Sequence, residues 1–112
     1  MAGKFEIYKS EKNDELYFRL KAANGQVVLA SQGYKEKAGA KNGVESVIKN
    51  SADVANYEKK ESSNGKFYFN LKSTNQQVIG ASQMYTSADG RDKGIEAVKN
   101  AADGAEVADL TV

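Results

Sequence analysis

Residues 26–34 read QVVLASQGY and residues 77–85 read QVIGASQMY, so the chain contains nearly the same nine-residue phrase twice. The two phrases lie 51 residues apart, and the same step relates many residues on either side of them. The equivalent pairs include Tyr17 and Tyr68, Asn24 and Asn75, Gly43 and Gly94, and Val47 and Val98. So dense a pattern is typical of a tandem duplication, and two copies are too few for a solenoid, which needs at least three repeats.

The duplication predicts two repeats, residues 1–58 and 57–112, that share one domain. A chain of 112 residues buries enough surface for one hydrophobic core but hardly for two independent ones. Past Val47 the step between matching residues falls to 50, because Lys49 and Asn50 match Lys99 and Asn100. We therefore expect the second repeat to have lost one residue inside its helix.

Each repeat opens with strands that alternate between apolar and polar residues. LYFRLK (16–21) and FYFNLK (67–72) alternate strictly, which is typical of half-buried strands. The quoted phrases supply the returning strands, and FEIYK (5–9) supplies a further one with Phe5 and Ile7 inward. Asn24-Gly25 predicts a two-residue type I′ hairpin turn. Asn75-Gln76 stands there in the second repeat, so we expect a looser turn or one of another type.

After each phrase the apolar period changes to 3.6, which predicts one helix per repeat. The two apolar stripes are Val44, Val47, Ile48 and Ser51, and Ile95, Val98 and Ala102. Thr86 to Asp89 resembles a capping box, whereas the first helix lacks a good N-cap residue. Each helix carries two glycines four residues apart: Gly39 and Gly43, and Gly90 and Gly94. These glycines indicate either close helix–sheet packing or contact with a ligand.

A strand is expected after each helix, in ANYEKKE (55–61) and in EVADLTV (106–112). The first of these segments both closes the first repeat and opens the second. This double role favours an α+β fold of tandem β3-α-β repeats that share one antiparallel sheet. Because the strands form sequential hairpins with a single apolar face, we expect both helices on that face.

The chain resembles the YegP-like family of small uncharacterised bacterial proteins in its duplicated form. The stretches that carry the resemblance are ASQGY (30–34), GVESVIKNSAD (43–53), GKFYFNLK (65–72), QVIGASQMY (77–85) and GIEAVKN (94–100). The resemblance implies paired β3-α-β units with one shared sheet and exchanged C-terminal strands. It implies no activity, substrate or catalytic residue.

The composition narrows the classes of function. The chain has no Cys and no His, so it lacks the thiolate nucleophile, the commonest general base and the usual ligands of transition metals. Ser31 and Ser82 have no evident partner base. We therefore predict a non-catalytic protein with no metal site and no cofactor, and an enzyme of unknown type is the alternative. No apolar run near 20 residues or signal-peptide pattern occurs, so we expect a cytoplasmic protein without a membrane span.

The main candidate binding surface is the sheet face opposite the helices. Alternation places seven residues there: Tyr8, Tyr17, Arg19, Lys21, Tyr68, Asn70 and Lys72. Tyrosines interleaved with cations on an open sheet are typical of proteins that bind single-stranded nucleic acid. A net charge of +1 and the nearby Glu6 and Glu58 favour a solvated face or a protein contact surface instead.

A second candidate is the repeated Ala-Ser-Gln-x-Tyr, where a strand turns into the helix of each repeat. Its residues are Ser31, Gln32 and Tyr34 in the first repeat, and Ser82, Gln83 and Tyr85 in the second. They either satisfy backbone groups at the junction or form two related polar pockets near helix N-termini. The sheet edges are a third candidate, for pairing with another chain. Because the repeats pair internally, we expect a monomer whose partners the sequence leaves unknown.

Overall fold

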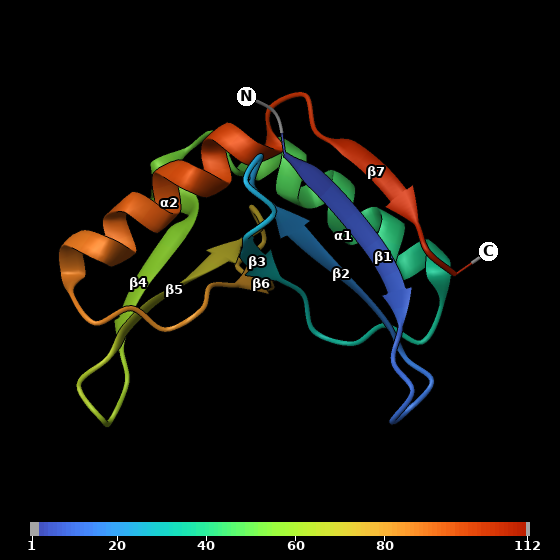
Figure 1. The fold of residues 1–112 in the computed structure, drawn as a ribbon, viewed down its shortest axis with the longest axis horizontal. Helices are drawn as coiled ribbons and strands as arrows, with labels where there is room; N and C mark the ends of the chain where they lie inside the picture. The colour runs from blue at the N-terminus through green and yellow to red at the C-terminus, as the bar shows by residue number, and fades with distance from the viewer. Residues whose placement is uncertain (1–2, 112) are drawn as a thin grey trace.

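The computed structural model describes residues 3–111, which form two helices and a single seven-stranded sheet (Figure 1). The elements of the first repeat are β1 (Lys4–Lys9), β2 (Leu16–Lys21), β3 (Val27–Ala30) and α1 (Lys37–Asn50). A single 3-10 turn (Val54–Asn56) follows, and then come β4 (Tyr57–Glu61), β5 (Phe67–Lys72), β6 (Val78–Ala81), α2 (Ala88–Ala102) and β7 (Glu106–Asp109). The predicted α+β class is confirmed. The last strand is shorter than expected, and Val112 lies outside the described residues.

The strands lie in the order β4-β5-β6-β3-β2-β1-β7, so both repeats contribute to one sheet. Figure 1 shows β3 and β6 side by side at its centre, where Ala30 pairs with Ala81. β7 leaves the second repeat and pairs with β1 of the first. The shared sheet and the exchange of this C-terminal strand are therefore confirmed.

The β1–β7 pair is parallel, whereas the other pairs are antiparallel, so the sheet is mixed and the prediction of a purely antiparallel sheet is wrong. The reason lies at the end of α2. The backbone N–H of Gly3 donates to the carbonyl of Ala101 at 2.8 Å, which holds the end of this helix beside the start of β1. β7 then begins at the same end of the sheet as β1 and runs in the same direction.

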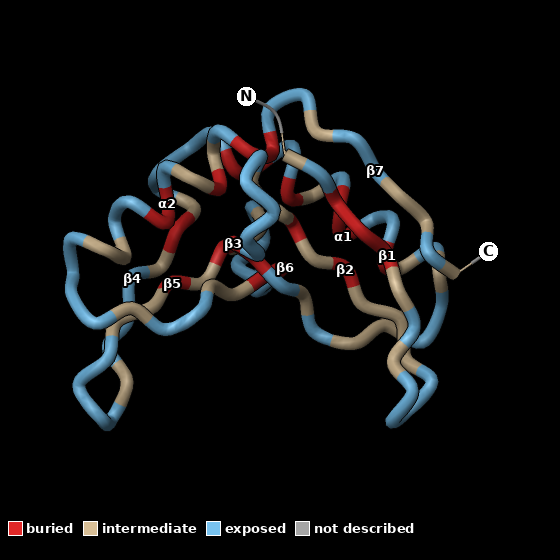
Figure 2. Tube along the Cα trace, viewed as in Figure 1, coloured by how far each residue is buried: buried red, intermediate tan, exposed pale blue. Residues whose placement is uncertain are grey.

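One face of the sheet forms the core together with both helices, as predicted (Figure 2). The strand residues that are fully buried there are Leu29 on β3 and, on β1, β2 and β5, Phe5, Ile7, Phe18, Leu20, Phe69 and Leu71. Each such side chain contributes about 1.5–3 kcal/mol when it is removed from water. The alternate residues of the same strands therefore face away from the helices, on what we call the open face.

Two predictions about the helices are wrong. Ile48 is 43% exposed, because it lies beside the buried seam that Val44 and Val47 form rather than within it. The buried positions keep the step of 51 to the end of the helix, since Asn50 and Ala101 occupy equivalent buried places. α2 has therefore not lost a residue, and the shift of register falls after the helix.

Both hairpin turns that precede the quoted phrases have the same geometry, which contradicts the predicted type I′ turn and the predicted difference between repeats. Gly25 N–H donates to Ala22 O, and Ala22 N–H donates to the carbonyl of residue 26. Only Gly25 has positive φ, at 84°, as in a type I turn followed by a bulge. Gln76 occupies the equivalent place with φ of 71° and makes the same bond to Ser73.

The helix starts differ between the repeats, as the sequence indicated. α1 begins after Glu36, whose side chain makes no capping bond. α2 begins after Ser87, whose hydroxyl accepts a hydrogen bond from Gly90 N–H at 3.0 Å. Ser87 is thus the N-cap, and the predicted capping box from Thr86 to Asp89 is wrong.

Candidate functional site

The seven residues predicted for the open face are half-buried there, but they form two groups rather than one strip. β1 and β2 carry the first group: Tyr8, Tyr17, Arg19 and Lys21. β5 carries the second group: Tyr68, Asn70 and Lys72. β3 and β6 separate the groups, and they meet through two alanines. The open face is therefore not a continuous row of aromatic side chains.

Glu6 is the centre of the first group. Arg19 Nε donates to Glu6 Oε1 at 2.7 Å, and Lys21 Nζ lies 3.3 Å from the same oxygen. Glu6 is only 8% exposed, and the hydrogen bond from Arg19 is the main cause that lowers its pKa. Tyr8 stacks on Tyr17 with centroids 5.8 Å apart, and the Arg19 guanidinium lies 4.6 Å from the Tyr8 centroid. These side chains are thus largely engaged with each other.

Glu58 has the equivalent role in the second group. Lys72 Nζ lies 3.0 Å from Glu58 Oε2, and Asn70 Nδ2 donates to Oε1 at 3.4 Å. The hydrogen bond from Lys72 is the main cause that lowers the pKa of Glu58. Lys60 Nζ also lies 3.8 Å from this carboxylate. The cations that the sequence placed on this face therefore have carboxylate partners, which reduces the positive potential offered to phosphates.

The serines of the repeated phrase satisfy backbone groups at the strand-to-helix junctions. Ser31 Oγ accepts from Phe18 N–H at 2.9 Å and donates to the carbonyl of Gln32 at 2.9 Å. Ser82 makes the same pair of bonds with Phe69 and Gln83 in the second repeat. This geometry matches the structural interpretation of the two junctions.

The tyrosines of the phrase pack beneath the helix glycines. Tyr34 and Tyr85 are half-buried, and burial raises the pKa of the Tyr34 hydroxyl. A Cβ added to Gly43 would lie 2.6 Å from Tyr34 Oη, and one added to Gly94 would collide with Tyr85 Oη. The glycines therefore allow the helices to approach these rings, as the packing interpretation predicts.

The two junctions contribute different residues to a hollow between the repeats. A shallow hollow of about 230 Å³ lies where β3 meets β6. Ser31 and Gln32 line it together with Val78, Gly80 and Ala81, whereas Tyr34, Ser82, Gln83 and Tyr85 are not among its lining residues. Both copies of the phrase therefore line this one hollow, the first through Ser31 and Gln32 and the second through Val78, Gly80 and Ala81.

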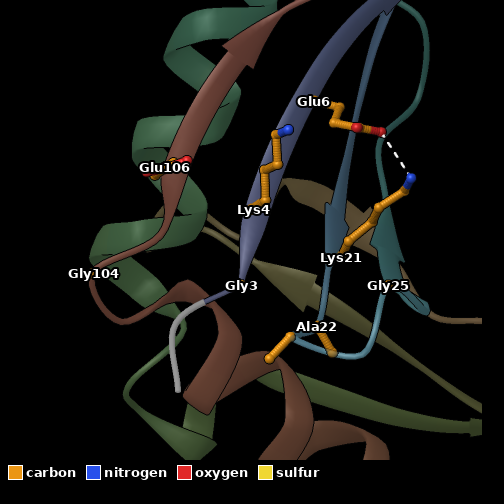
Figure 3. Close-up of a pocket in the computed structure, with 9 residues that line it drawn as sticks. Gly3, Lys4, Glu6, Lys21, Ala22, Gly25, Gly104 and Glu106 are labelled. Carbon is orange, nitrogen blue, oxygen red and sulfur yellow. Dashed lines mark ion pairs between the residues drawn. The ribbon is translucent and has the colours of Figure 1, made fainter.

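A cavity lies at the end of the open face, between β1, β2 and β7 (Figure 3). It has a volume of about 500 Å³. Figure 3 shows Lys4 and Glu6 on β1, Lys21 on β2 and Glu106 on β7 around it. Sequence reasoning placed Lys21 on this face but missed the cavity, because its lining comes from segments a hundred residues apart in the chain.

The charges of this cavity are unequally paired. Lys4 is directly opposite Lys21 in the β1–β2 register and directly opposite Glu106 in the β1–β7 register. Lys21 forms an ion pair with Glu6, whereas no described residue forms an ion pair with Lys4. Like charges directly opposite each other destabilise a strand pair. An anion between the two ammonium groups would relieve that repulsion.

A smaller hollow of about 240 Å³ lies at the equivalent place in the second repeat. Glu58 and Lys72 line it as Glu6 and Lys21 line the first. Asn56 and Gln76 line this hollow where Lys4 and Gly25 line the first, and within residues 3–111 no strand equivalent to β7 forms a wall. The duplicated architecture therefore forms two cavities, of which the first is larger and carries two cations.

No helix in residues 3–111 is both long and apolar enough to cross a membrane. Among those residues, no three His, Cys, Asp or Glu side chains are grouped so that they could hold a metal ion.

Comparison with known proteins identifies the family. The sequence model of DUF1508, a domain of unknown function, matches residues 11–58 and again residues 62–109. The chain belongs to the DUF1508 family. The two matches confirm the duplication, and the relatives described next confirm the resemblance to YegP-like proteins.

Relatives in this family align with nearly the whole chain. A UPF0339 protein from the 5′ region of the ptx operon of Stutzerimonas stutzeri is 58% identical over 110 residues, which is 98% of each chain. The UPF0339 protein YegP of Escherichia coli K12 is 52% identical over 99 residues, 88% of this chain and 89% of YegP.

Solved structures show the same fold. The solution NMR structure of E. coli YegP, described as a protein of unknown function, superimposes with a TM-score of 0.93 at 49% identity. It covers 99% of this chain and 95% of that one. The solution NMR structure of a UPF0339 protein from Shewanella oneidensis has a TM-score of 0.91, also at 49% identity, and covers 99% and 93%. The shared fold of the DUF1508 repeats is thus established.

Proposed function

We propose that this protein is a non-catalytic, cytoplasmic binding protein whose ligand is a small molecule with a carboxylate group. The observation that carries the proposal is the pair of opposed lysines, Lys4 and Lys21, in the cavity of about 500 Å³ between β1, β2 and β7. A cavity of this size is within the range of small-molecule sites.

The charges of the cavity suggest how such a ligand lies. Its carboxylate would accept hydrogen bonds from Lys4 and Lys21, and charge-assisted bonds of this kind are stronger than neutral ones. Glu6 holds Lys21 in place through their 3.3 Å ion pair. Glu106, on the opposite wall, favours a ligand that also carries an amine or another donor. The site therefore suits a zwitterion such as a free amino acid.

Single-stranded nucleic acid is the alternative ligand of the open face. The stacked tyrosine pair, the Arg19 guanidinium and the ion pairs of both groups count against it. Binding would have to break these contacts before bases could stack on the rings or phosphates could meet the cations.

An NMR titration of the isotope-labelled full-length protein distinguishes the two ligands. The probes are glycine, glutamate, succinate, inorganic phosphate and, at about 50 mM salt where phosphate contacts are strong, an oligothymidylate. We expect saturable shifts with the carboxylates at the amides of residues 3–6 and 22–25. Lys4→Ala is expected to abolish them, and Asn56→Ala, in the equivalent hollow, to leave them unchanged.

Two outcomes contradict the proposal. One is the absence of saturable shifts with every carboxylate ligand at concentrations up to about 10 mM. A dissociation constant of about 10 mM corresponds to a binding free energy of only about −3 kcal/mol. The other is a saturable shift that Lys4→Ala leaves intact. Shifts at Tyr8, Tyr17 and Tyr68 with the oligonucleotide alone would favour the nucleic-acid alternative.

A further inference from the structure

The two repeats differ at the outer edges of their opening strands. β1 lies between β2 and β7, whereas β4 pairs only with β5 among the described strands. The registers show which residues correspond. Phe5 is opposite Leu20 and Tyr57 is opposite Leu71, so Tyr57 occupies the place of Phe5. By the same register Lys59 occupies the place of Ile7. The place that β7 fills beside β1 thus has an unfilled counterpart beside β4 (Figure 1).

The backbone of β4 is arranged to accept a strand at this edge. Ser62 N–H donates to Lys66 O in the β4–β5 hairpin. Because backbone direction alternates along an antiparallel pair, residues 58 and 60 turn toward β5, and residues 57, 59 and 61 turn outward. On β1 the outward groups are used, since Leu110 N–H donates to Ile7 O at 2.8 Å. On β4 the outward N–H of Tyr57 donates to Val54 O, whereas the outward groups of Lys59 and Glu61 have no strand partner among the described residues.

A groove runs beside this edge, between β4 and α2, with a volume of about 390 Å³. Val54 and Ile95 supply its apolar surface, and Val54 is 58% exposed. Its cations are Lys59, which lies 3.2 Å from Asp92, and Lys99, which pairs with Glu96. The groove thus combines the exposed Val54 with two lysines, each of which has a carboxylate partner on α2.

In the first repeat, β7 shows what fits such a place. Val107 is opposite Phe5, Ala108 is opposite Glu6, and Asp109 is opposite Ile7. Asp109 Oδ2 lies 3.0 Å from Lys37 Nζ of α1, so an acidic side chain of the added strand meets a cation of the helix. Hydrogen bonds from the hydroxyl and N–H of Thr111, and then from Lys37, hold the pKa of Asp109 well below its usual range.

We propose that the free edge of β4 binds an extended segment of a partner protein as an additional strand, parallel to β4. The segment has an apolar residue opposite Tyr57, a small residue opposite Glu58 and an acidic residue opposite Lys59, as Val107, Ala108 and Asp109 have beside β1. The apolar residue contacts the exposed Val54, and the acidic residue takes the place of Asp92 beside the ammonium group of Lys59.

The charges of the edge favour this occupant over a second copy of the chain. Charged side chains, lysines above all, commonly protect an edge strand from unwanted pairing. Two β4 strands paired antiparallel about their centres would place Lys59 opposite Lys59, which is unfavourable. A partner strand with an acidic residue opposite Lys59 avoids this repulsion, because its carboxylate can replace Asp92 as the partner of that ammonium group.

The chain supplies its own probe for the test. A peptide of sequence AEVADLT (residues 105–111), with blocked ends, is titrated into the isotope-labelled full-length protein. We expect saturable NMR shifts at Val54, Lys99 and the amides of residues 57–61. The same peptide with Asp109→Lys is expected to bind at least tenfold more weakly.

Protein variants test the backbone and the charge separately. Lys59→Pro removes a backbone N–H that points away from β5, so the hydrogen bonds between β4 and β5 stay intact. Proline is tolerated at such a position of an edge strand. Lys59→Glu keeps that N–H and reverses the charge. Both are expected to weaken binding at least tenfold, and the matched control Lys60→Ala to leave it unchanged, because the backbone of Lys60 faces β5. Circular dichroism checks that each variant is folded, and if Lys59→Pro unfolds, Lys59→Glu decides alone.

Several results would overturn the proposal. These are no saturable shift, shifts centred on β1 that indicate displacement of β7, or an affinity that the Lys59 variants leave unchanged. A molar mass near twice 12.1 kDa, with shifts at β4 in the absence of peptide, would show that a second copy occupies the edge instead.

Discussion

The two repeats have different residues at one pair of equivalent core positions, Leu29 and Gly80. The reason is the space available where the repeats meet. These two residues lie 51 residues apart on β3 and β6, the strands that join the repeats. A Cβ added to Gly80 would lie 2.8 Å from Cγ and Cδ2 of Leu29. There is room for one leucine at this joint but not for two. Two repeats in one chain can have leucine at this position in one repeat and glycine in the other. Two identical copies would have the same residue at both places.

Gly80→Leu tests this joint and has the largest expected effect. A second leucine overpacks the core, and we expect unfolding free energy to fall by about 3 kcal/mol, at the upper end for such changes. Urea denaturation followed by circular dichroism measures it. The double variant Leu29→Gly with Gly80→Leu moves the leucine to the other repeat and is expected to regain most of the loss. If the single variant is as stable as the parent, the joint is not tightly packed.

The two glutamates of the open face differ in burial, which predicts unequal roles. Glu6 accepts from Arg19 in a half-buried setting, and Glu6→Gln leaves two cations without their carboxylate. We expect a loss of about 2 kcal/mol at pH 7, the scale of hydrogen bonds to charged groups. Glu58→Gln is the matched control, and its effect is expected to be smaller because Glu58 and its partners are more exposed.

The same pair predicts a pH dependence. The pKa of Glu6 is lower in the folded protein than its ordinary value, so the stabilisation is fully present above the unfolded pKa of about 4.3. It is lost as the pH falls through the lowered folded value. Urea midpoints at pH 7 and pH 3 are therefore expected to differ less in Glu6→Gln than in the parent protein. An equal difference in both would mean that Glu6 is not the group responsible.

The smallest expected effect concerns the helix starts. Glu36 precedes α1 in an extended conformation without a capping bond, whereas Ser87 caps α2. Glu36→Ser should allow a bond to Gly39 N–H and raise the unfolding free energy by about 0.5–1 kcal/mol. Ser87→Ala is expected to lower it by a similar amount. Thermal denaturation of both variants measures the two changes, and a stabilising Ser87→Ala would contradict the capping role.

Much of the fold could be predicted because it depends on local pattern. Alternation in LYFRLK placed Phe18 and Leu20 in the core, and the 3.6-residue period placed Val47 and Val98 there. The turn geometry was missed because Asn-Gly fits both a two-residue turn and a three-residue one. Gln76 adopts positive φ where the first repeat has glycine. The length of the loop, rather than the residue at this position, therefore determines the type of turn.

The candidate site was less predictable from the sequence. Alternation placed Arg19 and Lys21 on the open face, but it could not show that Glu6 binds both. The cavity escaped prediction because Lys4 and Glu106 are neighbours only through the pairing of β1 with β7. Which strands pair depends on how whole helices and strands pack together. The hydrophobic periodicity of a single segment does not predict it.

The sequence by itself determined the duplication, the type of each element and the face that each element buries, because these follow from spacing along the chain. The tertiary structure alone decided that β7 runs parallel to β1, that Leu29 fills the joint for both repeats and that β4 pairs only with β5 among the described strands. These features depend on the space left for side chains, and on the backbone groups left without a hydrogen-bond partner, after segments distant in the sequence have packed together. That is why two nearly identical phrases occupy unlike halves of one sheet.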